Sequence, residues 1–134
     1  KGSLLAAQAV LPFLRARKAG SVVFFSSTMA RTGGMNSVAY SATKGGILGL
    51  MRSMALDVAR DNIRVNAVSP AIADTAMPRA NLDAAQMASR AGANPMKRIG
   101  TPQDMAEAAL FLLDKENSFM TGQDLRVTGG ANLF

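Results

Sequence analysis

The chain has 134 residues, 49% of them apolar, and its lack of histidine and cysteine excludes disulfides, histidine- or thiolate-ligated metal sites and a Ser-His-Asp triad. The net charge of +6 comes from scattered basic residues, and one tyrosine without any tryptophan offers little base stacking, so we expect no nucleic-acid partner. The absence of cysteine, of a signal-peptide pattern and of an apolar run of about 18 residues leads us to expect a cytoplasmic chain with no membrane partner.

The start of the chain predicts a helix followed by a strand. Residues 4–17 place apolar side chains at helical spacing, and Pro12 within them predicts a kink or a lost hydrogen bond. Gly20 is expected to end this helix. Residues 21–25 end in an unbroken apolar run, which indicates a buried strand of a parallel sheet.

A long helix is predicted next, after a loop at residues 31–34. It covers residues 37–60, and Asn36 or Ser37 is expected to cap its N-terminus. Apolar and small residues lie almost all the way around this helix, which predicts burial on more than one side.

The next part of the chain predicts a second strand and an irregular segment. The strand covers residues 63–68, and the Ser-Pro pair at residues 69–70 is expected to end it. Proline, asparagine and glycine interrupt residues 71–100, where a weak helical signal spans residues 82–90. We expect residues 71–100 to form a mobile insert on the substrate side of the strand ends.

A capped helix and a short strand complete the pattern. Thr101 is expected to cap the helix, with Pro102 in its first turn and Asp104 near the positive end of the helix dipole. A final strand covers residues 124–127. The expected core face of the helix consists of Met105, Ala108, Ala109, Phe111, Leu112 and Leu113.

Helices and strands alternate along the whole chain, which predicts an α/β fold with right-handed crossovers between parallel strands. Only three strands are visible in the pattern, whereas parallel sheets covered on both faces are usually larger. We therefore expect the chain to be the C-terminal half of a larger domain.

Candidate catalytic residues gather where the first strand ends and the long helix begins. Tyr40 and Lys44 occupy positions i and i+4 of that helix, so their side chains share one face, and Ser27 follows the strand. An ammonium group favours the ionised form of a nearby phenol, which lets the phenol exchange a proton near neutral pH. A strand end, a loop and a capped helix bring such side chains to the carboxyl edge of the sheet, where ligands bind.

Each of these residues also has a simpler explanation. Tyr40 could be ordinary half-buried packing, Ser27 could cap the strand end, and Thr75 could be an ordinary loop or N-cap residue. Most methionines are expected to fill the core, although three in the insert could line an apolar substrate pocket: Met77, Met87 and Met96.

Five segments, in this order and spacing, carry a resemblance that covers essentially the whole chain. They are Ser27, the Tyr40-x-x-x-Lys44 pair, Asn-Ala-Val-Ser-Pro at residues 66–70 leading to Thr75, Arg-Ile-Gly-Thr-Pro at residues 98–102, and Thr-Gly-Gln at residues 121–123 with Gly129-Gly130. Together they resemble the short-chain dehydrogenase/reductase family, of the classical 3-oxoacyl-carrier-protein reductase-like type. The resemblance implies the C-terminal half of a Rossmann-like doubly wound parallel sheet, with the N-terminal βαβ half absent. Residues 1–134 would be the C-terminal catalytic portion of a single dinucleotide-binding domain.

The resemblance implies a role for each matching residue. Tyr40 would be the general acid/base that exchanges a proton with the substrate oxygen. Lys44 would favour the phenolate form of Tyr40 and bind the nicotinamide ribose, and Ser27 would orient the substrate oxygen. The cofactor would be NAD or NADP, with its carboxamide bound by the segment that contains Pro70, Ala71, Ala73 and Thr75.

The chain departs from the family pattern in three respects. The Gly-rich turn that seats a pyrophosphate is absent from the sequence, as are the residue that selects NAD or NADP and the family's active-site asparagine. Ala71 stands where the family usually has glycine, which would strain the loop if the site needs a positive φ. Thr128 stands where an acidic or amide residue is frequent.

These expectations lead to one preferred function and one alternative. The preferred function is an oxidoreductase that transfers a hydride between NAD(P) and a small-molecule ketone/secondary alcohol pair. We expect the 134 residues alone to be inactive. The alternative is a truncated, non-catalytic homologue that acts as an assembly or regulatory subunit. In either case we expect a homo-oligomer, a dimer or a tetramer, because two helices carry more apolar surface than three strands can cover.

Overall fold

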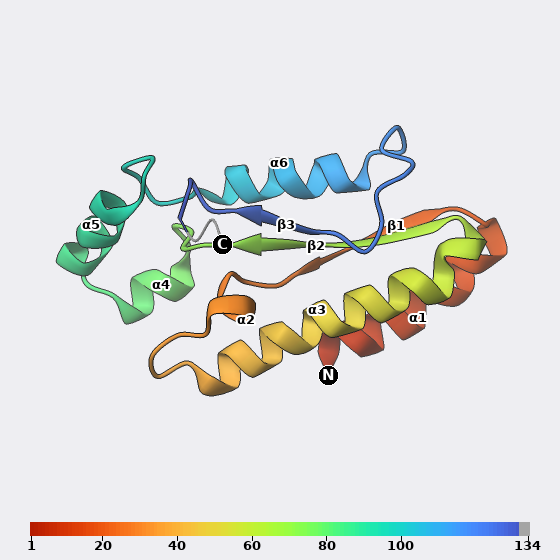
Figure 1. Ribbon diagram of the computed structural model, residues 1–134, viewed down its shortest axis with the longest axis horizontal. Coiled ribbons are helices and arrows are strands. Elements are labelled where there is room, and N and C mark those ends of the chain that lie inside the picture. The colour runs from red at the N-terminus through yellow and green to blue at the C-terminus, as the bar shows by residue number, and fades with distance from the viewer. Residues whose placement is uncertain (132–134) are drawn as a thin grey trace.

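The computed structural model describes residues 1–131, and its elements follow the predicted alternation of helices and strands (Figure 1). A single 3₁₀ turn, η1, continues the longest helix. In chain order the elements are α1 (Gly2–Arg17), β1 (Gly20–Phe25), α2 (Met29–Thr32), α3 (Val38–Val58), η1 (Ala59–Asp61), β2 (Ile63–Pro70), α4 (Ala76–Asn81), α5 (Ala84–Ala93), α6 (Pro102–Leu113) and β3 (Asp124–Val127).

The three strands form one parallel sheet in the order β1-β2-β3. Strand β1 pairs with β2 from Gly20 opposite Ile63 to Phe25 opposite Val68, and β3 pairs with the second half of β2. Because all strands run in the same direction, their carboxyl ends meet at one edge of the sheet. The central strand β2 is buried except at Arg64 and Pro70, as expected for a strand that is covered on both faces.

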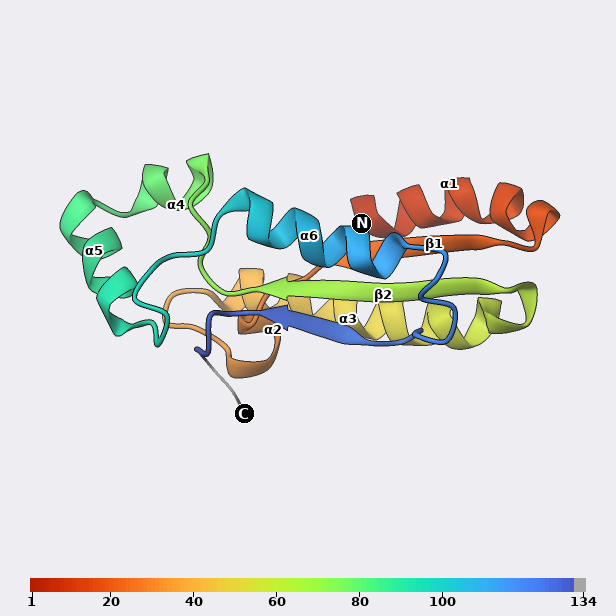
Figure 2. The same ribbon diagram turned by 90° about the horizontal axis from the view of Figure 1, so that it is seen from above.

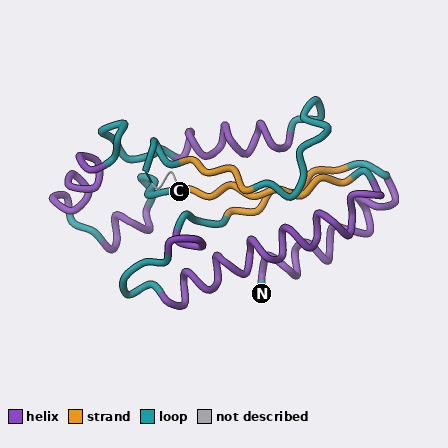
Figure 3. Tube along the Cα trace, viewed as in Figure 1, coloured by secondary structure: helices purple, strands orange, loops and turns teal. Residues whose placement is uncertain are grey.

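Helices cover the two faces of the sheet unequally. Helices α1 and α3 lie against one face and α6 lies against the other, as Figures 1 and 2 show from two directions. The main core lies between the sheet and α3, where Leu48, Met51 and Val58 are almost completely buried. Helices α4 and α5 lie beyond the carboxyl ends of the strands, where Figure 3 shows several connecting loops. Within residues 1–131, no helix is long and apolar enough to cross a membrane.

The boundary between α1 and β1 differs from the prediction. The helix continues through Pro12 and ends at Arg17, because Lys18 adopts a left-handed conformation with φ of 48°. Gly20 is therefore the first residue of β1 and does not end the helix. A Cβ atom at Gly20 would lie only 2.9 Å from the Leu14 side chain, so a larger residue there would require that side chain to shift.

Strand β1 is less buried than its apolar sequence predicts. Four of its six residues are half-buried and Phe25 is 46% exposed, because β1 is an edge strand of the described sheet. The predicted loop at residues 31–34 begins as a helical turn, α2. Ser37 does occupy the N-cap position of α3, but its Oγ donates to the Met35 carbonyl and makes no capping bond.

Within residues 1–131, the buried residues of helix α3 lie on one side of the helix, whereas the sequence predicts burial on more than one side. Its buried residues face β1 and β2, whereas Val38 and Leu56 on other faces are 84% and 81% exposed. The apolar residues on those faces have no covering element within residues 1–131.

Strand β2 is longer than predicted, because Pro70 is its last residue and pairs with Val127 of β3. Proline is tolerated there since it stands at the end of the strand. The insert at residues 71–100 contains two helices instead of one, and neither has a buried residue. Helix α5 begins with a capping box between Asp83 and Gln86.

Thr101 is the N-cap of helix α6, as predicted, and the structure adds a reciprocal bond that makes Thr101 and Asp104 a capping box. Arg98 also donates two hydrogen bonds to the Asp104 carboxylate. The bonds from Arg98, and those from Thr101, hold the pKa of Asp104 well below its usual range. The predicted core face is only partly correct: Met105 and Leu112 are buried, whereas Phe111 and Leu113 are exposed.

Candidate active site

The carboxyl end of β1 holds Ser27 in a fixed position beside β2. The Ser26 amide donates to the Val68 carbonyl and the Thr28 amide donates to the Pro70 carbonyl, so the backbone on both sides of Ser27 is bound to the central strand. The Ser27 side chain is buried, and its Oγ accepts a hydrogen bond from the Met29 amide. This bond starts α2 and leaves the Ser27 hydroxyl proton available for donation.

Tyr40 and Lys44 lie on one face of α3, as their spacing predicts. The Lys44 Nζ lies 5.7 Å from the centre of the Tyr40 ring, and the Tyr40 side chain is 39% exposed. A phenol in this position has both a cation beside it and access to solvent, which suits proton exchange.

Helix α3 and the end of β1 are joined through Lys44. The Lys44 Nζ donates to the Phe25 carbonyl at 2.9 Å, so the ammonium group binds the last residue of β1, two residues before Ser27 in the chain. Ser26 Oγ donates to the backbone carbonyl of Lys44, also at 2.9 Å. The structure therefore brings together the strand end that carries Ser27 and the helix that carries the Tyr40–Lys44 pair.

The other four predicted site residues are the last residue of β2 and three residues after it, at the same edge of the sheet. Pro70 ends the strand, and the Ala71 amide donates to the Val127 carbonyl. Ala73 forms an isolated parallel bridge with Gly100. Thr75 is exposed and occupies the N-cap position of α4, but it makes no side-chain capping bond.

Ala71 does not have the positive φ that would strain an alanine at this position. The non-glycine residues with positive φ in the described chain are Lys18, Asn36, Asn62 and Lys97, and Ala71 is not among them. Its backbone instead continues from β2 and pairs with β3, so alanine is compatible with this position.

An ion pair between Arg31 and Asp124, which the sequence did not predict, connects α2 to the neighbouring strands. The Asp124 side chain is only 4% exposed, and its Oδ1 accepts a short hydrogen bond from the Ser69 hydroxyl. Arg31 of α2 lies with its Nε 3.2 Å from Asp124 Oδ2, within ion-pair distance, although Oδ2 accepts no hydrogen bond from the described residues. The only signal in the sequence is one acidic residue at the start of a short predicted strand.

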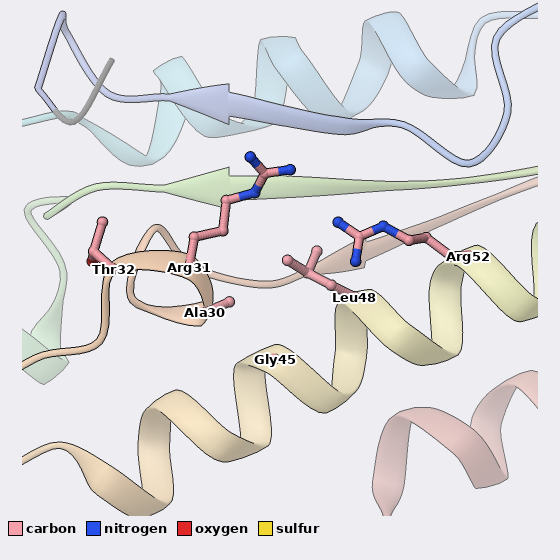
Figure 4. Close-up of a pocket in the computed structure, with 6 residues that line it drawn as sticks. All are labelled: Ala30, Arg31, Thr32, Gly45, Leu48 and Arg52. Carbon is pink, nitrogen blue, oxygen red and sulfur yellow. The ribbon is translucent and has the colours of Figure 1, made fainter. Parts of the chain in front are cut away.

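A cavity of about 540 Å³ lies between α2 and α3 (Figure 4). The side chains of Arg31 and Arg52 come from these two helices and line it together with Leu48. Gly45 also lines this cavity, next to Lys44 in the chain, whereas Ser27 and Tyr40 do not. The predicted catalytic residues thus lie at the edge of the sheet, outside this cavity.

Comparison with known proteins agrees with the resemblance of the sequence motifs. Residues 1–132 match the family described as Enoyl-(Acyl carrier protein) reductase. The 3-oxoacyl-[acyl-carrier-protein] reductase FabG of Buchnera aphidicola subsp. Schizaphis graminum is 38% identical over 114 residues, which are 85% of this chain and 46% of the relative. The chain spans about half the length of the curated relatives it matches.

Solved structures with bound nicotinamide cofactors have the same fold over most of this chain. ElxO with NADP bound is 30% identical, with a TM-score of 0.89, and the match covers 96% of this chain and 53% of ElxO. A 3-oxoacyl-[acyl-carrier protein] reductase with bound NAD from Brucella melitensis is 33% identical, with a TM-score of 0.84 and coverage of 96% and 47%.

Proposed function

Because the chain belongs to the short-chain dehydrogenase/reductase family and is similar to its 3-oxoacyl-carrier-protein reductases, we propose that it is the C-terminal catalytic portion, residues 1–134, of a dinucleotide-binding domain. Its three parallel strands and their helices are part of a Rossmann-like sheet. The complete protein transfers a hydride between NAD(P) and a ketone/secondary alcohol pair. The observation that carries this proposal is the position of the Lys44 ammonium group. It lies beside the Tyr40 ring and donates to the carbonyl of Phe25, two residues before Ser27.

Tyr40 is the general acid/base in this proposal. During reduction, its hydroxyl gives a proton to the substrate oxygen as that oxygen becomes an alcohol, and during oxidation it takes the proton back. Ser27 donates its hydroxyl proton in a hydrogen bond to the same oxygen and orients it. The buried position of Ser27 and the bond that its Oγ accepts from Met29 support this role, because they restrict the hydroxyl to few orientations.

The described residues fit the nicotinamide end of the cofactor, which supplies the hydride when it is bound. Lys44 presents an ammonium group with three donors, of which the Phe25 carbonyl uses one, so two remain for ribose hydroxyls. The backbone from Pro70 to Ala73, together with the Thr75 hydroxyl, lies at the same edge and would hold the carboxamide. Residues 1–134 contain no Gly-rich pyrophosphate turn, so we expect these residues alone to be inactive and to bind neither NADH nor NADPH at micromolar concentration.

The insert at residues 71–100 would cover the substrate and move when it binds. Its two helices have no buried residue, which supports mobility. The residues near its two ends are held in place, because the Asn94 side chain donates to the Thr128 carbonyl and Ala73 pairs with Gly100. Movement would therefore be confined to α4, α5 and the residues between them.

A tyrosine substitution in the full-length protein tests the proposed chemistry. We expect Tyr40→Phe to lower kcat for ketone reduction by about 10²-fold or more, because phenylalanine keeps the ring but has no proton to give. The matched control is Thr43→Val, which removes a hydroxyl from an exposed position in the same helical turn and should leave kcat unchanged. Near-normal turnover by Tyr40→Phe would exclude this mechanism. A wild-type protein that binds cofactor but reduces no ketone would favour the alternative of an assembly or regulatory subunit.

A further inference from the structure

Ser26, the residue before Ser27, makes a contact that the proposed chemistry does not use. Its side chain is 4% exposed, and its hydroxyl donates to the Lys44 carbonyl of α3 at 2.9 Å. A buried hydroxyl of this kind needs a partner, but a strand neighbour or a nearby turn could have provided one. Ser26 instead bonds to the backbone of one of the predicted catalytic residues.

A second hydrogen bond connects the same two segments. The Lys44 ammonium donates to the Phe25 carbonyl, so residues 25 and 26 hold Lys44 by its side chain and by its backbone. Each bond restrains the other, because both join one residue of the helix to two consecutive residues, the last residue of β1 and the residue after it. The position of the Lys44 ammonium group therefore depends on the distance between α3 and the end of β1, which the Ser26 hydrogen bond maintains.

The strand side of this connection is rigid. The Ser26 amide bonds to Val68 and the Thr28 amide bonds to Pro70, so the end of β1 cannot shift relative to the central strand without breaking ladder bonds. The helix side is less restrained near its start. The buried residues of α3 begin at Leu48, whereas Tyr40 and Lys44 precede the buried part.

From this arrangement we infer that Ser26 is a positioning residue, whose hydroxyl sets the distance between Ser27 and the Tyr40–Lys44 pair. The inference rests on the proposed function, in which Ser27 and Tyr40 act on one substrate oxygen. Such groups must be held within about 0.5 Å of their working geometry. A displacement of about 1 Å can lower a rate by about 10²-fold.

Ser21, which lies in β1 itself, provides a matched control. Its hydroxyl also donates to a helix carbonyl at 2.9 Å, but the acceptor is Leu112 of α6, on the opposite face of the sheet. Ser21→Ala and Ser26→Ala each remove one hydroxyl and one strand-to-helix bond. We expect similar melting temperatures for the two full-length variants, because the same type of interaction is lost.

The expected difference is in catalysis. Ser26→Ala should lower kcat about tenfold or more, with a KM for the ketone within about threefold of wild type, whereas Ser21→Ala should keep the wild-type kcat. Ser26→Thr retains a hydroxyl and should keep kcat within about threefold of wild type. The inference is overturned if Ser26→Ala loses no more rate than Ser21→Ala, if Ser26→Thr is as slow as Ser26→Ala, or if Ser26→Ala melts far below Ser21→Ala.

A structural measurement separates this inference from the proposed function. Crystal structures of the full-length wild type and of Ser26→Ala should show a longer separation between Ser27 Oγ and Lys44 Nζ in the variant. If the wild type has no reductase activity, the proposed function fails while this comparison still tests the positioning. An unchanged separation overturns the positioning inference even when the enzyme is active.

Discussion

At the scale of single residues, Lys44 is in contact with three residues of the candidate site: Tyr40, Phe25 and Ser26. Its ammonium lies beside the Tyr40 ring and donates to Phe25, and its carbonyl accepts from Ser26. A charged group with one protein acceptor and two unused donors is suited to bind a polar ligand. We therefore expect its removal to affect both binding and rate.

The corresponding prediction compares two cations on α3. In the full-length protein, Lys44→Met should weaken NAD(P)H binding and lower kcat, each by about tenfold or more, because hydrogen bonds to a charged group contribute about 1.5–3 kcal/mol. Arg52→Met removes the same charge from an exposed position farther along the helix and should change neither. Nicotinamide fluorescence titration and steady-state kinetics measure the two effects. Equal effects of both substitutions would show that only the overall charge matters.

At the scale of elements, the start of α6 depends on one carboxylate. Asp104 accepts hydrogen bonds from Arg98 and from the Thr101 amide and hydroxyl, and these keep its pKa below the usual value. Because this pKa is lower in the folded than in the unfolded chain, where it is about 3.9, the carboxylate stabilises the fold above about pH 4. That contribution decreases as the pH falls further, toward the folded-state pKa.

Asp104→Asn should consequently lower the melting temperature at pH 7, and its difference from wild type should shrink as the pH falls from about 5 to 2. The control is Glu107→Gln, which removes one charge from the next turn of α6 without touching the capping box. Thermal unfolding of the full-length variants at several pH values measures this. A difference that does not vary with pH would show that the carboxylate charge has no part in the stability of this turn.

The attachment of α2 to the sheet is a second feature at this scale. The buried Asp124 carboxylate has one cationic partner in the described chain, Arg31, and this arginine is half-exposed. Removing the arginine leaves the buried carboxylate with its hydrogen bond from Ser69 but without this cationic partner, whereas removing both charges does not.

Arg31→Met should therefore destabilise the wild-type protein more than it destabilises the Asp124→Asn variant. We expect a coupling of about 1 kcal/mol, at the low end for buried pairs because solvent screens Arg31. Urea unfolding of the four proteins at one fixed protein concentration completes the cycle. Additive effects of the two substitutions would mean that the ion pair does not hold α2 in place.

At the scale of the whole molecule, apolar side chains remain exposed on the outer faces of α1 and α3. Phe13 of α1 is 71% exposed, and Leu56 of α3 is 81% exposed. Exposed apolar surface shared by neighbouring helices is typical of an interface between subunits. We propose that these two helices pair with their copies in a homo-oligomer, a dimer or a tetramer.

Phe13→Arg in the full-length protein should dissociate or aggregate the oligomer, because it places a charge in an apolar interface. The control is Phe119→Arg, which makes the same change in the fully exposed loop before β3 and should leave the assembly intact. Light scattering at micromolar concentration measures the mass of each protein. A stable wild-type monomer, or equal behaviour of the two variants, would contradict the assignment of the interface to α1 and α3.

The features that depend on local spacing can be read from the amino-acid sequence alone. Local spacing and residue type predict the alternation of helices and parallel strands, the N-cap at Thr101 and the Tyr40–Lys44 pair, and the structure confirms these features. Which helix faces are buried, and which residues far apart in the sequence come into contact, depends on the tertiary structure. Whether α3 is covered on one side, and whether Ser26 bonds to Lys44, depends on how strands and helices pack against one another. Local periodicity carries no information about such contacts, because each is fixed by the position of another element.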